Sequence, residues 1–142
     1  SDRNARWEMM MASTDGALAF VKGLGAVHSM SHAAGRLKEL KLHHGTLNAV
    51  ILPTVLRFNE SVCSDPYLRL RQAMGLAPDA DLAREIEKLN SDLGLPSGLA
   101  EMGLSEDLIK DMVPHAVSDL ATMTNPKKVS AEDYAELYRS AM

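Results

Sequence analysis

The sequence predicts an all-α fold, a helical bundle of one domain over residues 1–142, from three observations. Apolar residues recur at intervals of three and four along most of the chain, which is the spacing of one helix face. Aromatic residues make up only 4%, and β-branched residues are also few, so sheet formation is disfavoured. Nine methionines can fill the irregular gaps between packed helices. No pair of candidate strands and no internal domain boundary is visible.

The first predicted helix covers residues 2–21 and ends at the glycines of the segment 23–25. Its apolar stripe is wide, because three methionines follow one another at residues 9–11. We therefore expect neighbours on more than one side of this helix, as in a helix buried inside a larger domain. The residues that form its apolar stripe are Trp7, Met10, Met11, Thr14, Leu18 and Val21.

Two longer helices and a short one are expected next. The long ones cover residues 26–37 and 45–59, and the second of them is apolar almost all round. We expect this second helix to be the centre of the core. Pro53 removes one backbone hydrogen bond inside it. The short helix begins at Asp65 and closes at Gly75.

An amphipathic helix follows, which Asp79 is expected to cap and Gly94 to end. The chain after this helix is expected to return to the core through Leu99 and Met102. The side chains expected to face inward from the helix itself are Leu82, Ile86, Leu89 and Leu93.

Two further helices complete the predicted fold. Ser105 precedes two acidic residues, which suit the N-terminal dipole, and is expected to cap a helix that runs past Pro114 to about residue 122, in one piece or in two. Ser130 and Asp133 have the spacing of a capping box, which opens a final helix over residues 131–141.

Composition and charge exclude several classes of function. The formal charge is −4 with acids and bases interspersed, so the sequence offers no basic surface for nucleic acid. No apolar run approaches the length needed to span a membrane, and we expect a cytoplasmic protein. The single cysteine, Cys63, rules out an internal disulfide and fits a reducing compartment. We expect its side chain to fill a small apolar gap.

Four of the chain's five histidines fall within residues 28–44, at spacings that a metal site can use. His28 and His32 are i and i+4 in an expected helix, so they lie on one face. His44 supplies a third imidazole after a short connection, and imidazole binds first-row metals well. Histidines at this spacing also occur on solvated helix faces or as hydrogen-bonded core residues. Both interpretations stay open, because a catalytic metal usually has at least three protein ligands.

Longer motifs surround these histidines and continue toward the C-terminus. They are Gly23-Leu24-Gly25-x-x-His28-x-x-x-His32, His44-Gly45-x-x-Asn48-Ala49, Asn125-Pro126-Lys127 and Glu136-Leu137-Tyr138. Together they resemble the iron-containing (group III) alcohol dehydrogenase family over nearly the whole chain. The resemblance implies a helical bundle similar to the C-terminal metal-binding domain of dehydroquinate synthase-like and iron-containing alcohol dehydrogenases.

The resemblance also implies a partial metal site. Members of the family begin with a nucleotide-binding α/β domain, and an aspartate and three histidines hold their metal. His28 and His44 match the second and third of those histidines; we choose His44 over His43 because it directly precedes the glycine. The aspartate and the first histidine lie upstream in the family. We therefore expect a C-terminal fragment that lacks the nucleotide-binding domain, which a start at Ser1 rather than Met also favours.

The reaction that the resemblance implies is the NAD(P)-dependent oxidation of an alcohol or hydroxy acid to the aldehyde, or the reverse. Fe²⁺ or Zn²⁺ bound by His28 and His44 would hold the substrate oxygen and lower the pKa of the alcohol. His32 matches a family histidine close to the nicotinamide and the substrate, which implies a catalytic proton-relay role and contact with the cofactor. Asn48 either orients the ligand helix or makes a capping or core hydrogen bond.

The substrate and the working state of the chain are also expectations. The segment 42–49 resembles most the branch that acts on short hydroxy acids such as 4-hydroxybutyrate, while a maleylacetate-reductase-like or simple primary-alcohol substrate stays open. We expect the isolated chain to fold, as a homo-oligomer that covers the first helix, and to be inactive. The alternative is a stand-alone helical scaffold or assembly module without catalytic activity.

Overall fold

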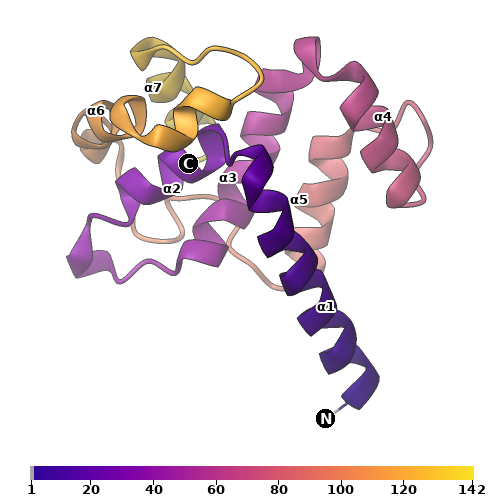
Figure 1. Ribbon diagram of the computed structural model, residues 1–142. Helices are drawn as coiled ribbons and strands as arrows, with labels where there is room; N and C mark the ends of the chain where they lie inside the picture. The colour runs from indigo at the N-terminus through magenta and orange to yellow at the C-terminus, as the bar shows by residue number, and fades with distance from the viewer. Residues whose placement is uncertain (1) are drawn as a thin grey trace.

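The fold consists of seven α-helices and five short 3-10 helices, and residues 2–142, which this computed structural model describes, contain no strand (Figure 1). The all-α prediction is therefore confirmed. No helix in this range is long and apolar enough to cross a lipid bilayer. The α-helices are α1 (Arg3–Ala19), α2 (Ala26–Ala34), α3 (His44–Asn59), α4 (Ser64–Ala73), α5 (Leu82–Asp92), α6 (Ile109–Ser118) and α7 (Ala131–Ser140). The 3-10 helices are Phe20–Lys22, Lys38–Leu40, Glu60–Val62, Glu106–Leu108 and Leu120–Thr124.

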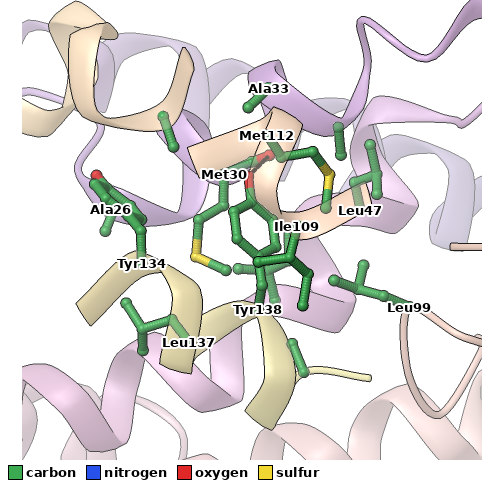
Figure 2. Packing of buried hydrophobic residues seen from close by; sticks show 14 of the residues in the cluster. Ala26, Met30, Ala33, Leu47, Leu99, Ile109, Met112, Tyr134, Leu137 and Tyr138 are labelled. Atoms are coloured by element: carbon green, nitrogen blue, oxygen red, sulfur yellow. Dashed lines mark hydrogen bonds between the residues drawn. The ribbon is translucent and has the colours of Figure 1, made fainter. Parts of the chain in front are cut away.

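The main hydrophobic core lies between α2, α3, α6 and α7. The helix α3 packs against α2, α5 and α7, which is the central place that its apolar composition predicts. Figure 2 shows Tyr134, Leu137 and Tyr138 entering this core from α7. The Tyr138 hydroxyl donates a hydrogen bond to the Met30 carbonyl at 2.8 Å, so its polar end is satisfied inside the core. The expected return of Leu99 and Met102 to the core is also present.

A second, smaller cluster joins α4 and α5 to the side of α3. Cys63, Tyr67 and Leu82 are buried together, and the Tyr67 hydroxyl donates to the Leu56 carbonyl at 3.0 Å. Cys63 is a free, buried thiol, which agrees with its expected role as an apolar filler.

Several expected helix ends and faces differ from the structure. Asp81, rather than Asp79, caps α5, because its carboxylate accepts a hydrogen bond from the Arg84 backbone N–H at 3.0 Å. Leu89 and Leu93 are exposed rather than inward, and Asn90 of the same helix contacts α3 instead by donating its side-chain amide to the Ala49 carbonyl at 2.8 Å. The Ser130–Asp133 capping box of α7 is confirmed.

The helix expected to reach residue 122 stops earlier. The α6 helix ends at Ser118, and Asp119 is extended, with its own carboxylate accepting the Ala121 backbone N–H. A separate 3-10 helix, Leu120–Thr124, follows this break. Ser105 makes no side-chain cap, because the short 3-10 helix Glu106–Leu108 precedes α6.

The first helix is exposed along its whole length. No residue of α1 is buried, and the helix projects away from the other helices (Figure 1). Trp7 is 61% exposed and Leu18 is 69% exposed, so the predicted apolar stripe faces solvent. The sequence does contain the apolar stripe, but no residue among 2–142 covers it.

Removal of the Tyr138 hydroxyl tests the core. Tyr138→Phe leaves the ring in place but deprives the buried Met30 carbonyl of a donor, so we expect a loss of about 1–3 kcal/mol in unfolding free energy. Leu120→Ala is the control, because this side chain is 81% exposed and should cost less than about 0.5 kcal/mol. Urea unfolding followed by circular dichroism measures both. Equal losses in the two variants would contradict the assigned hydrogen bond.

Candidate functional site

Three imidazoles meet where α2 lies against the start of α3. His28 and His32 stand one turn apart on α2, and His44 is the first residue of α3. The ring centroids are 5.6 Å apart for His28 and His32, 5.3 Å for His28 and His44, and 5.4 Å for His32 and His44. Lys41, in the left-handed conformation with φ 48°, helps turn the chain back between the two helices. The structure thus brings together the three histidines that the sequence suggested.

The two neighbouring histidines at the start of α3 have different roles. His43 caps the helix, because its Nδ1 accepts the backbone N–H of Thr46 at 3.3 Å. His44 faces α2 instead, with its Nδ1 3.4 Å from the Ser31 hydroxyl. This geometry supports the choice of His44 over His43, although its role as a ligand stays a prediction.

Asn48 joins the two expected metal ligands. Its Nδ2 lies 3.0 Å from His44 Nε2 and 3.4 Å from His28 Nε2, so both ring nitrogens converge on one point. When this NH₂ group donates, the Nε2 atoms accept, and both rings are neutral with their proton on Nδ1. The other amide atom, Asn48 Oδ1, is buried and has no hydrogen-bond partner in the protein. Asn48 therefore contacts the imidazoles directly instead of capping a helix.

The pKa of His28 is lowered mainly by burial, then by the nearby His44 and His32, while Asp119 opposes this shift. Burial also lowers the pKa of His44, with further contributions from His32 and His43. Both imidazoles therefore favour the neutral form. This is the form in which histidine binds a metal ion.

His32 faces a different partner. Its Nδ1 lies 3.0 Å from Asp119 Oδ2, which comes from the extended residue after α6. No sequence pattern singles out Asp119, because it is 87 residues away from His32. Both side chains line an open cavity of about 180 Å³, together with Ala33, Arg36, His115 and Ser118. His115 itself is exposed.

The start of the histidine helix is fixed from the far end of the chain. Gly25 has φ 78° and no side chain to cap α2. Asn125 supplies the cap, because its Oδ1 accepts the Ala26 backbone N–H at 3.1 Å. A Cβ atom at Gly25 would come within 3.0 Å of that same oxygen. The glycine therefore lets the segment around Asn125 approach the helix closely.

The donor set fits part of a metal site. Two neutral imidazoles whose Nε2 atoms converge are suitable ligands for iron or zinc. Within the described range, however, no group of three or more His, Cys, Asp and Glu side chains is placed to hold a metal ion. A cavity of about 310 Å³ between α3, α5 and the C-terminal residues Ser140 and Ala141 is lined by no histidine. The site is therefore a candidate for two ligands of a larger set.

Comparisons with known proteins find a matching family model and two longer relatives. The model of the "Fe-containing alcohol dehydrogenase family, C-terminal" matches residues 1–142. The 4-hydroxybutyrate dehydrogenase of Cupriavidus necator is 49% identical, with 99% of this chain and 39% of that protein covered. The NAD-dependent methanol dehydrogenase of Bacillus methanolicus is 34% identical, again with 99% of this chain and 39% of that protein covered. The chain thus spans about two fifths of the length of these relatives.

A solved structure supports the fold. The crystal structure of a 1,3-propanediol oxidoreductase superimposes with a TM-score of 0.77 at 31% sequence identity. The superposition covers 84% of this chain and 33% of that one. The helical arrangement described above is therefore also found in a larger oxidoreductase.

The lowered histidine pKa values predict how stability depends on pH. Above the ordinary imidazole value of about 6.5, the folded and unfolded chains are both neutral at His28 and His44. Below it, the unfolded chain takes up protons more readily, so the unfolding free energy falls as the pH drops through the lower folded values. We expect His28→Gln with His44→Gln to reduce this slope, while Leu120→Ala, which removes an exposed side chain and no titrating group, leaves it unchanged. Urea unfolding between pH 5 and 8 measures the slopes; identical slopes in all three proteins would contradict the assignment.

Proposed function

The chain belongs to the Fe-containing alcohol dehydrogenase family, and from that membership we propose that it is the metal-binding helical part of an NAD(P)-dependent dehydrogenase. The complete enzyme oxidises an alcohol or hydroxy acid to the aldehyde, or catalyses the reverse reduction. The observation that carries this proposal is the convergence of His28 Nε2 and His44 Nε2 on one point beside Asn48. We propose that residues 1–142 form one domain of that enzyme and that its nucleotide-binding part lies outside them.

We propose His28 and His44 as ligands of a divalent metal, iron before zinc because of the family. Bound iron supplies Lewis-acid polarisation of an alcohol oxygen, which makes the hydroxyl proton easier to remove. In this structure both Nε2 lone pairs accept from Asn48 Nδ2, so the amide must turn away from that point before the two rings bind the metal. The ring centroid of His32 lies 5.6 Å from that of His28 and 5.4 Å from that of His44. In this proposal His32 relays the hydroxyl proton of the substrate and contacts the nicotinamide.

The proposed substrate is a short hydroxy acid such as 4-hydroxybutyrate. The 49% identity to a 4-hydroxybutyrate dehydrogenase supports this choice, compared with 34% to a methanol dehydrogenase. A simple primary alcohol is the second candidate. We place the enzyme in the cytoplasm, where the free thiol of Cys63 stays reduced.

One observation favours a different class of function. Fewer than three metal ligands come together among residues 2–142, and the whole of α1 is exposed. A homo-oligomer that covers α1 and serves as a scaffold without catalysis is therefore the second proposal. The two proposals differ in what they predict for metal binding.

Metal titration of the purified chain tests the ligand assignment. We expect weak, saturable binding of Fe²⁺ under anaerobic conditions or of Zn²⁺ by calorimetry, because two ligands provide only part of a site. The double variant His28→Ala, His44→Ala should show no binding, and His115→Ala should bind as the unmodified chain does. If the double variant gives the same isotherm as the unmodified chain, the scaffold proposal is favoured.

A chimera tests the reaction. The chain by itself, with iron, NAD⁺ and 4-hydroxybutyrate, should give no steady NADH formation. When it replaces the matching 39% of the Cupriavidus necator enzyme, we expect NADH formation to be restored. Asn48→Ala in this chimera should keep metal-dependent NADH formation, because the amide occupies the Nε2 atoms that bind the metal and does not support the rings from Nδ1. Faster oxidation of methanol than of 4-hydroxybutyrate would contradict the proposed substrate.

A further inference from the structure

Asp119 uses its two carboxylate oxygens for two separate tasks. Oδ1 accepts the backbone N–H of Ala121 at 2.9 Å, while Oδ2 lies 3.0 Å from His32 Nδ1. The first bond fixes the carboxylate relative to its own backbone. The contact with His32 is therefore made by an oxygen whose position the first bond already fixes.

The segment that carries Asp119 is itself tied to the core. The Thr122 hydroxyl donates to the Ala116 carbonyl at 2.8 Å, which closes the turn between α6 and the 3-10 helix Leu120–Thr124. The same hydroxyl lies 2.6 Å from the buried Tyr134 hydroxyl and 2.9 Å from the Ser29 hydroxyl of α2. The frame that holds Asp119 thus includes the helix that carries His32. The distance between Asp119 and His32 is therefore set by contacts among three helices rather than by a surface loop.

The chemistry of this pair determines which ring nitrogen carries a proton. An ionised carboxylate only accepts hydrogen bonds, so His32 must donate to it from Nδ1–H. A neutral ring that is protonated at Nδ1 has its lone pair at Nε2. Without such a partner, a neutral imidazole exchanges between both tautomers.

We propose that Asp119 is a positioning residue, which fixes the ring orientation and the tautomer of His32 so that Nε2 is the proton acceptor. This inference rests on the proposed proton-relay function of His32 and adds the residue that makes the ring competent for it. Carboxylates hold histidine rings in this way in many active sites. Asp119 itself does not contact substrate or cofactor.

Long-range ¹H–¹⁵N NMR of the metal-free chain measures the tautomer directly. The spectrum is recorded about two pH units above the ordinary imidazole value of ~6.5, and the His32 signals are assigned from their loss in His32→Gln. We expect His32 to show the Nδ1–H pattern alone. In Asp119→Asn the pattern should change to a mixture, because one amide oxygen must now serve both the Ala121 N–H and His32.

Asp111→Asn is the matched control, since it removes the same charge from an exposed position of α6. It should leave the His32 tautomer unchanged. An Nε2–H pattern in the unmodified chain, or an unchanged Nδ1–H pattern in folded Asp119→Asn, would overturn the proposal. If Asp119→Asn does not fold, the spectrum of the unmodified chain still decides. A failure of metal binding would count against the proposed function alone, because the tautomer is measured without metal.

Discussion

The hydrogen bonds between the start of α2 and residues 121–125 are the constraint on which the site depends. Asn125 Oδ1 accepts both the Ala26 N–H and the Asn59 amide, so one side chain connects the start of α2 to the end of α3. The Asn59 side-chain oxygen Oδ1 in turn accepts from Asn125 Nδ2 at 2.9 Å. Because these groups are partly buried, each needs its partner, and the two helices hold a fixed relation. That relation places the imidazoles of α2 beside the first residue of α3.

The division of α2 into two faces determines where its histidines point. Met30, Ala33 and Ala34 are almost fully buried in the main core, and they occupy the side that faces α6 and α7. His28 and His32 are left on the side toward His44, where His28 is half-buried and His32 is exposed. The small side chains on the core side allow close helix packing, and the close packing holds the imidazoles near one another. Core and site therefore share a single short helix.

The sequence predicted the parts of this arrangement that depend on local patterns. The spacing of apolar residues located the helices, the Ser130 and Asp133 pair located the start of α7, and the histidine motifs indicated the family. Apolar spacing identifies a helix face but not its partner, which is why the exposure of Leu89 was not predicted. The pairing of Asp119 with His32 could not be predicted from the sequence for the same reason, since only the tertiary fold brings the two side chains together.

The distance in sequence between α2 and its cap has a consequence for synthesis. Asn125 follows Ala26 by 99 residues, and contacts of such separation form late because a long loop must close first. On the ribosome, α2 and the start of α3 emerge well before the segment that holds them. The start of α2 therefore has no cap until Asn125 has left the exit tunnel. A nascent chain that has not yet released residues 119–125 lacks both this cap and the carboxylate partner of His32.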